Sequence, residues 1–327
     1  MMTFICRTIS FLAKAATIAL VFCLLACFGV TKIMWLNYFP PFMFQYFIGA
    51  AVLALVFLGL RNLKWLLLCA FLTCATGYEY IAANNLLSSP PSVVSDDSYA
   101  LKIISFNQLR YNKHVGTFLS RPDVQSADVI VLLEANKHSK ESAQKLKNIF
   151  PHQFMALGLS SKSMIVLSKY PLENLERIRM FEDDPAENFI VHFDVTPDTN
   201  NTPTRIIALH TKAPIPYRRI AERNTELARL SEVINNAPKD RPIIALGDFN
   251  ITPYNLNFKN LLKQTGLTSL HSVYNLPAHS WPSFSPWVLR FQIDHILING
   301  RVQPISLKAI KADGSDHLAL SGSFAIE

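Results

Sequence analysis

The chain has 327 residues, which is long for one domain, and with 50% hydrophobic and 17% charged residues it is apolar for a soluble protein. The net charge of +7 is weak evidence for nucleic-acid binding, because residues 1–80 carry +4 of it and leave only +3 for the longer remainder. All five cysteines lie in the first 80 residues, so the remainder has no disulfide, thiolate zinc site or cysteine nucleophile. Chemistry there must use Asp, Glu, His, Asn or hydroxyl groups.

Three apolar stretches near the N-terminus, 15–30, 41–60 and 65–83, have about the ~20 residues that a helix needs to cross a bilayer. The gaps between them are short, so residues 1–83 are predicted to form a membrane region of three transmembrane helices. A signal peptide ending at Cys27 is one alternative, but two more apolar stretches follow it. Buried helices of a soluble domain are the other alternative, which three such stretches in eighty residues disfavour.

The basic residues beside these stretches predict the orientation. Arg7, Lys14, Arg61 and Lys64 lie on one side of the predicted bilayer, and only Lys32 lies on the other. Because basic residues stay in the cytoplasm, the N-terminus is predicted to be cytoplasmic. Three crossings then place the rest of the chain outside, which in a bacterium means an inner-membrane, multi-pass protein with a periplasmic domain. The lipid bilayer is thus an expected partner, and no protein partner is predicted.

Residues 84–100 are rich in Ser, Pro, Asn and Asp and have no hydrophobic periodicity, which predicts a linker between the membrane region and a domain over 101–327. In this domain, short apolar runs end repeatedly in a polar residue. The runs 101–106, 128–133, 204–209 and 241–246 lead to Asn107, Glu134, His210, and Asp248 with Asn250. Runs without alternation are typical of strands buried on both faces.

Further strands are predicted over 164–168, 189–195 and 291–298, and helices over 139–150 and 217–236. The mixture indicates an α/β layered fold. On the second helix Arg223 could contact substrate, but an arginine on an amphipathic helix usually belongs to a solvated face.

Two short polar motifs have ordinary interpretations as turns. Gly and Asp in 247–250 and in 313–317 are residues that end strands, because they tolerate left-handed backbone geometry. The loop 279–291 contains Trp281, Phe284 and Trp287. These rings could stack on nucleobases, pack within the loop, or contact lipid headgroups near a membrane.

Taken together, the polar residues make a stronger case for a site. Four carboxylates, two amides and two imidazoles are available: Glu134, Asp248, Asp294, Asp316, Asn107, Asn250, His210 and His317. Oxygen ligands without thiolates suit Mg²⁺, Mn²⁺ or Ca²⁺ better than zinc or copper. Such an ion favours phosphoryl chemistry, because it neutralises charge on a phosphodiester while a base takes a proton from water.

The motifs "SFN", "LLE", "LHTKAP", "GDFN", "IDHIL" and "SDH" occur in the order of the endonuclease/exonuclease/phosphatase superfamily, which residues 101–323 resemble. The resemblance implies a DNase I-like four-layered α/β sandwich. It also implies that Glu134 binds Mg²⁺ or Mn²⁺, assisted by Asn107 and Asp316.

The same resemblance implies the catalytic roles. Asp248 orients or deprotonates the attacking water, and Asn250 holds a phosphate oxygen. His317 pairs with Asp294, and His210 contacts the scissile phosphate. Which group is the base remains open.

One departure from the superfamily is Gln292, where many relatives carry an arginine; Arg290 is a possible substitute. The leading hypothesis is a membrane-anchored, divalent-metal-dependent phosphoesterase with nuclease-like action on phosphodiester bonds. A phosphoinositide or sphingomyelin-type lipid phosphoesterase is one alternative, and a catalytically inactive membrane scaffold is another. The expected substrate is accordingly a nucleic acid or a phospholipid headgroup.

Overall fold

The computed structural model describes residues 2–28, 33–86, 99–157, 162–181, 188–197, 202–270 and 278–326. Helices α1 (Met2–Phe28), α2 (Met43–Gly59) and α3 (Leu63–Ala83) form the N-terminal unit, with the short 3-10 helices η1 (Met34–Tyr38) and η2 (Pro40–Phe42) before α2. Among the described residues, three helical segments are long and apolar enough to cross a membrane: Phe4–Cys27, Met34–Gly59, which joins η1 and η2 to α2, and Leu63–Ala83. The prediction of three apolar helices is confirmed, although α1 begins thirteen residues earlier than expected.

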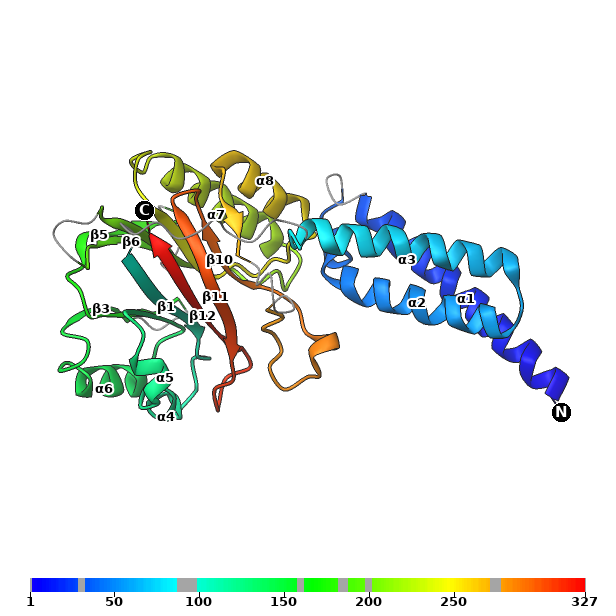
Figure 1. Cartoon of the computed structure of the whole chain (residues 1–327), viewed down its shortest axis with the longest axis horizontal. Helices are drawn as coiled ribbons and strands as arrows, with labels where there is room; N and C mark the ends of the chain where they lie inside the picture. The colour runs from blue at the N-terminus through cyan, green and yellow to red at the C-terminus, as the bar shows by residue number, and fades with distance from the viewer. Residues whose placement is uncertain are drawn as a thin grey trace.

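Within the described part of residues 99–326, the strands form two six-stranded mixed sheets (Figure 1). The first sheet has the order β11 (Val302–Ile310), β12 (Ala319–Ile326), β1 (Tyr99–Asn107), β2 (Val129–Leu133), β4 (Met164–Ser168) and β3 (His152–Ala156). The second has the order β5 (Glu173–Arg179), β6 (Phe189–Val195), β7 (Thr204–His210), β8 (Ile243–Asp248), β10 (Asp294–Ile298) and β9 (Thr268–Ser269).

The two sheets pack face to face, and helices cover their outer faces. One apolar core lies between the sheets and includes Val131, Phe193 and Ile296. A second core lies under α4 (Val115–Leu119), α5 (Pro122–Gln125) and α6 (Lys137–Lys145), and a third lies under α7 (Arg219–Asn235) and α8 (Leu256–Thr265). The predicted four-layered α/β sandwich is therefore confirmed, and the central strands are non-alternating because both of their faces are buried.

Each sheet contains one parallel pair of neighbouring strands. β1 pairs with β2, and β7 pairs with β8 in the register that places His210 beside Asp248. Parallel strands end on the same side, so the polar residues at the carboxyl ends of these four strands gather at one edge of the sandwich. Gly247 permits this approach, since its φ is +142° and a Cβ there would lie 1.9 Å from the carbonyl oxygen of Leu209.

The N-terminal helices project from one side of the sandwich (Figure 1). The start of α2 and the end of α3 pack against the sandwich through an apolar cluster that includes Phe44, Tyr80, Tyr254 and Trp287. Asn84 donates a hydrogen bond to the hydroxyl oxygen of Tyr254 (3.1 Å). The contact buries aromatic rings from both units.

Several elements depart from the sequence-based expectations. The strands β3, β5 and β11 were not predicted; β5 has mostly exposed positions and β11 contains Pro304, so neither shows a buried-strand pattern. The strand expected over 291–298 begins only at Asp294, and the helix expected over 139–150 spans 137–145. Most of the predicted linker, 87–98, lies outside the described residues.

Candidate active site

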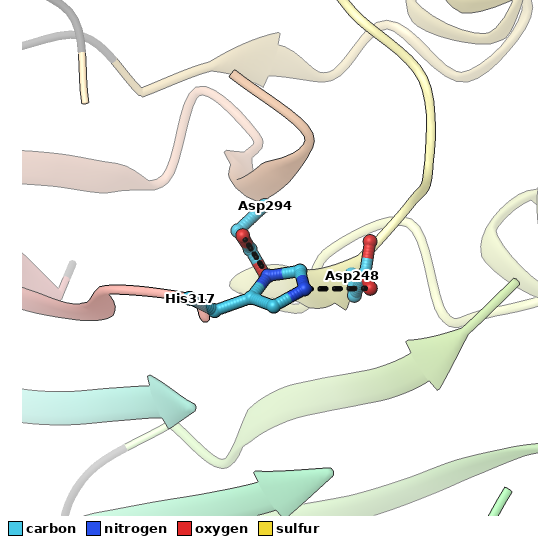
Figure 2. A group of neighbouring side chains, drawn as sticks. All are labelled: Asp248, Asp294 and His317. Carbon is cyan, nitrogen blue, oxygen red and sulfur yellow. Dashed lines mark hydrogen bonds and ion pairs between the residues drawn. The ribbon is translucent and has the colours of Figure 1, made fainter. Parts of the chain in front are cut away.

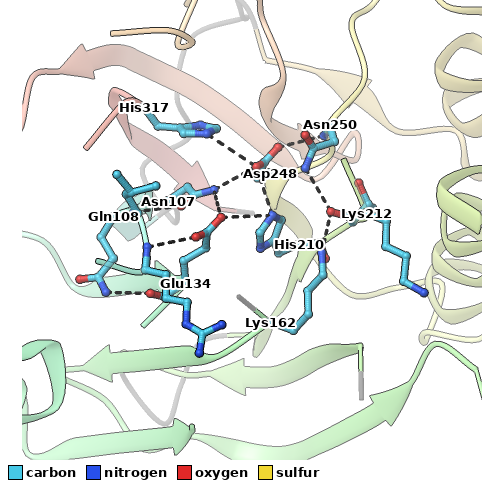
Figure 3. Close-up of polar contacts among 12 residues, drawn as sticks. Asn107, Gln108, Glu134, Lys162, His210, Lys212, Asp248, Asn250 and His317 are labelled. Atoms are coloured by element: carbon cyan, nitrogen blue, oxygen red, sulfur yellow. Dashed lines mark hydrogen bonds and ion pairs between the residues drawn. The ribbon is translucent and has the colours of Figure 1, made fainter. Parts of the chain in front are cut away.

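Asn107, Glu134, His210 and Asp248 meet at the edge where β1, β2, β7 and β8 end (Figure 3). All four had been predicted as site residues from their positions after apolar runs. Glu134 follows β2 with a φ of +54°, a backbone conformation that turns the chain sharply at the strand end.

Glu134 is held from the side of the first sheet. Its Oε2 accepts a hydrogen bond from the backbone N–H of Arg110 (3.0 Å), and its Oε1 accepts one from Asn107 Nδ2 (3.3 Å). Asn107 Nδ2 also donates to Asp248 Oδ2 (3.0 Å), so this amide joins the carboxylates of the two sheets. Ser315 Oγ donates to the carbonyl oxygen of Asn107 (2.7 Å), which fixes the 313–317 loop against the end of β1.

Asp248 is the centre of the network, and 1% of its surface is exposed. Its Oδ1 accepts the backbone N–H of Asn250 (2.9 Å), and its Oδ2 lies 3.3 Å from His210 Nε2. Burial would raise the pKa of Asp248, but the hydrogen bond and charge of His210, the charge of His317 and the Asn250 N–H outweigh it and hold this pKa well below its usual range. Asp248 is therefore a carboxylate at neutral pH.

His317 and Asp294 form a buried pair directed at Asp248 (Figure 2). His317 Nδ1 lies 2.8 Å from Asp294 Oδ2, and His317 Nε2 lies 3.9 Å from Asp248 Oδ2. Ser280 Oγ donates a second hydrogen bond to Asp294 Oδ2. Burial and the charge of Asp248 raise the pKa of Asp294, while the charge of His317 and both hydrogen bonds lower it, so the carboxylate is stabilised by the imidazolium beside it. Burial opposes a charge on His317, but the charge and hydrogen bond of Asp294 and the charge of Asp248 raise its pKa to about 10. The geometry thus favours an imidazolium next to Asp248.

Asp248, Asp294 and His317 offer ligand atoms within 4.8 Å of one another, a spacing that a metal site could also have. The Nδ1 of His317 faces Asp294 at 2.8 Å, so this group is arranged as a hydrogen-bonded His–Asp pair beside Asp248. Glu134 and Asp316 offer further carboxylate oxygens in the lining of one pocket. Asp316 Oδ2 accepts a hydrogen bond from Trp281 Nε1 (2.9 Å), whereas its buried Oδ1 makes no hydrogen bond within the described residues. Carboxylate and amide oxygens fit Mg²⁺ or Mn²⁺.

Asn250 lies on the same side as Asp248, two residues further on. Its Nδ2 donates to the carbonyl oxygen of Thr211 (3.1 Å), and its φ is +48°. Phe249 between them is fully buried. The solvated position expected for Arg223 is wrong: its side chain is buried, and Nη1 donates to the carbonyl oxygen of Asn250 (3.0 Å). The hydrophobic periodicity of a helix identifies its buried face. It does not show whether a polar residue on that face has a hydrogen-bond partner elsewhere in the fold.

Lys162 is a buried residue of the site that the sequence analysis missed. Its Nζ donates to the carbonyl oxygens of His210 (3.1 Å) and Thr211 (2.8 Å) from below the site (Figure 3). Burial lowers its pKa to about 8, against the opposing charges of Glu226, Asp248 and Glu134. Residues 160–164 read "SSKSM", which contains no motif that would have marked this lysine.

Arg290 does not contact the predicted catalytic residues. It therefore does not replace the arginine expected from the family resemblance at the position of Gln292. It donates to the backbone carbonyls of Ser285 (2.7 Å) and Ser283 (2.9 Å) within its own loop. In that loop Trp287 stacks on His279 and contacts Phe44 of α2. Of the three interpretations of the loop aromatics, namely base stacking, packing and contact with lipid headgroups, Trp287 therefore follows the second.

A model of the endonuclease/exonuclease/phosphatase family matches residues 104–317, well over half of the chain. The chain belongs to this family. Members of the family are phosphoesterases that generally use divalent metal ions. The match includes all eight predicted site residues and excludes the N-terminal helices.

A curated relative, the uncharacterised protein YbhP of Escherichia coli strain K12, is 27% identical over 118 residues. These residues are 36% of this chain and 44% of YbhP, so the chain spans less than half the length of the curated relatives it matches. The fold of the family also appears in solved structures. Sphingomyelinase C from Streptomyces griseocarneus has a TM-score of 0.53 at 15% identity, covering 69% of this chain and 99% of that one.

TDP2 of D. rerio, complexed with a single-strand DNA product, has a TM-score of 0.56 at 19% identity and covers 69% and 98% of the two chains. The family protein from Beutenbergia cavernae DSM 12333 has a TM-score of 0.57 at 14% identity and covers 69% and 72%. At these identities the likeness is one of fold, and it leaves the substrate open.

Proposed function

We propose that this protein is a membrane-anchored, divalent-metal-dependent phosphoesterase that hydrolyses phosphodiester bonds. The arrangement that supports this is a pocket of about 550 Å³ with two kinds of catalytic group in its walls. Glu134 and Asp316 lie in its lining together with Asp248 and His317. A phosphate bound in this pocket would lie next to carboxylates that can bind a cation and next to an imidazolium that can donate a hydrogen bond to a phosphate oxygen.

Glu134, Asn107 and Asp316 are the residues proposed to hold Mg²⁺ or Mn²⁺. When bound, the ion supplies positive charge that neutralises the phosphodiester and stabilises charge on the leaving oxygen. Asn107 Nδ2 donates to Glu134 Oε1, so the oxygen that Asn107 would offer the ion is Oδ1, which accepts the N–H of Leu109 (3.2 Å). The Oδ1 of Asp316, which makes no hydrogen bond within the described residues, gives the loop 313–317 a ligand to offer.

The protein residues then perform the hydrolysis. Asp248, ionised and oriented by three hydrogen-bonding neighbours, takes a proton from the attacking water. The water oxygen forms a bond to phosphorus while the bond to the leaving oxygen breaks, and that oxygen keeps the electron pair and takes a proton from solvent. The His317 imidazolium, His210 and the Asn250 amide stabilise the negative charge on the non-bridging oxygens. The products are a phosphomonoester and an alcohol.

The N-terminal helices are proposed to anchor the enzyme in the inner membrane, with the catalytic domain in the periplasm. The support is the length and apolarity of α1, α2 and α3, and the position of the basic residues. Reporter fusions after residues 62 and 90 test the orientation. An outward-facing reporter at the first position, or an inward-facing one at the second, would refute it.

The activity test uses the full chain in detergent with bis(p-nitrophenyl) phosphate, with Mg²⁺, Mn²⁺ or EDTA. We expect turnover that EDTA abolishes and that Asp248→Asn lowers at least a hundredfold. Asp240→Asn is the matched control, since the exposed Asp240 precedes β8 at the end remote from the site. No metal-dependent turnover, or equal turnover by Asp248→Asn, would instead favour the inactive scaffold.

A further inference from the structure

The segment between α1 and α2 forms one wall of the active-site pocket. Asn37, Tyr38, Pro41 and Phe42 line the pocket opposite catalytic residues such as His210. None of these four residues lies in the part of the chain that matches the family. The pocket is thus closed by the N-terminal unit and not by the sandwich alone.

This wall is docked onto the catalytic loops by specific contacts. Tyr38 Oη donates to the carbonyl oxygen of Pro214 (2.8 Å), four residues after His210. Asn255 Nδ2, in the loop after β8, donates to Asn37 Oδ1 in a buried bond (3.1 Å). The ring of Phe42 lies edge-on to Phe291, with 5.1 Å between centroids. The wall is therefore held in one position relative to Asp248.

The same wall is the first part of the candidate membrane span Met34–Gly59, at the end where this span meets the sandwich. Phe42 directly precedes Met43, the first residue of α2, and Tyr254 beside the pocket packs on Tyr80 in the last turn of α3. If the helices cross a bilayer, the pocket opens at the lipid headgroup level. Tyrosines at helix ends are typical of that level.

Two loops of the sandwich carry exposed apolar side chains next to this wall. Ile215 (68% exposed) follows the carbonyl that Tyr38 binds, and Tyr217 lies two residues further. On the other loop Leu289 (54% exposed) follows Val288, whose carbonyl accepts a hydrogen bond from Gln45 of α2 (3.0 Å). These side chains form an apolar rim that fits a membrane surface better than water.

The pocket lining holds few cations for a nucleic acid, although the exposed Arg218 and Arg219 follow Tyr217 outside the lining. Arg223 is the one Lys or Arg among the described lining residues, and its guanidinium donates to Asn250 and to Asn224 Oδ1 (3.0 Å). A nucleic-acid site needs several cations along the phosphate backbone. A bilayer at the rim would also exclude a duplex, whereas a phospholipid arrives from the bilayer with its phosphate at the correct depth.

We propose that the pocket takes a phospholipid while its acyl chains remain in the bilayer, and that Tyr38 and Phe42 bind the part of the lipid next to the scissile phosphate. This inference rests on the proposed phosphoesterase function and names its substrate class. Water attacks phosphorus, its proton goes to Asp248, and the leaving oxygen departs with the bonding pair. One product, either the phosphomonoester or the alcohol, stays in the membrane.

The test reconstitutes the full chain into vesicles of phosphatidylethanolamine and phosphatidylglycerol, and follows lipid products by mass spectrometry with Mg²⁺ and with EDTA. Bis(p-nitrophenyl) phosphate, plasmid DNA and a single-stranded oligonucleotide are assayed on the same preparation. We expect metal-dependent cleavage of the lipid and of the small diester, but not of DNA. Cleavage of the small diester and DNA without lipid overturns this inference and keeps the proposed function, whereas no cleavage of the small diester overturns both.

Variants of the wall provide the second readout. Phe42→Ala and Tyr38→Ala should lower the ratio of lipid to small-diester turnover at least tenfold. Trp35→Ala is the control, because Trp35 is an exposed aromatic residue of the same segment that does not line the pocket. Phe42 is itself 41% exposed, so its removal leaves no buried cavity. An unchanged ratio in both wall variants would show that the wall does not bind the substrate.

Discussion

The replacement Asp294→Asn tests the role of the His317–Asp294 pair with little change in shape. Asparagine keeps the size of the side chain and can still accept a hydrogen bond from Ser280, but it removes the charge that faces His317 Nδ1 at 2.8 Å. The pKa of His317 is raised from 6.5 to about 10, which corresponds to about 5 kcal/mol in favour of the protonated form. Without the charge of Asp294, burial still lowers this pKa while the charges of Asp248 and Asp316 still raise it, so the pKa of His317 should fall well below 10.

The expected kinetic effect follows from the lost positive charge. At about pH 7.5 wild-type His317 is an imidazolium, whereas in Asp294→Asn a smaller fraction of His317 is protonated and it stabilises the phosphate oxygens less well. We expect kcat on bis(p-nitrophenyl) phosphate to fall by about 10² to 10⁴. The pH profile separates this from a folding defect. The wild type should keep the imidazolium up to about pH 10, while the variant should lose activity at a lower pH than the wild type does and regain part of it in acid.

The assay is a pH series with saturating Mg²⁺, and Asp240→Asn is the charge-matched control. If Asp294→Asn stays within threefold of the wild type at pH 7.5 and has the same high-pH limb, the imidazolium is not part of the mechanism. The same result would return His317 to the list of possible metal ligands, which a titration with Mn²⁺ would then examine.

Three further outcomes are expected. Glu134→Gln should weaken Mn²⁺ binding at least tenfold by isothermal titration calorimetry, and the exposed control Glu141→Gln should not; equal affinities would remove Glu134 from the metal site. Arg223→Lys should lower the free energy of unfolding by about 1–3 kcal/mol and kcat severalfold, because the Nη1 bond to the Asn250 carbonyl is lost; a wild-type melting curve and kcat would contradict this. Burial lowers the pKa of His279 to about 4, so as the pH falls from 6.5 to 4 the unfolded chain binds a proton that the folded chain does not. The free energy of unfolding should therefore drop by up to about 3 kcal/mol over that range. The drop should be smaller in His279→Phe, as measured by melting temperatures at the two pH values.

The sequence by itself predicted much of the site because strand ends are local features. A strand that is buried on both faces appears in the sequence as a continuous apolar run, whichever strands it pairs with. The residue that follows the run is therefore known from the sequence alone. Asn107, Glu134, His210 and Asp248 were found in this way, and the parallel pairing of β1 with β2 and of β7 with β8 brings them to one edge. The family motifs, read in order, then assigned the four layers.

Hydrophobic periodicity could not predict hydrogen-bond partners that are distant in the chain. Arg223 lies three residues after Ile220 and four before Leu227, on the buried face of α7, and the turn at Asn250 supplies a carbonyl that makes the burial of its charge possible. Lys162 sits in a stretch without any motif, and its Nζ donates to the carbonyl oxygens of His210 and Thr211 at the end of β7. In both cases the free energy of burying a charge depends on hydrogen bonds made across the fold.

The relation between the two units was also decided by tertiary structure. Hydropathy alone predicted three membrane-spanning helices and, separately, an α/β domain, joined by a linker that implied no contact. The packing of Phe42 on Phe291 and the bond from Tyr38 to Pro214 instead make the N-terminal unit a wall of the pocket. Apolar stretches and strand ends are encoded by neighbouring residues, whereas a pocket is made by segments 170 or more positions apart, as the Tyr38–Pro214 separation of 176 shows.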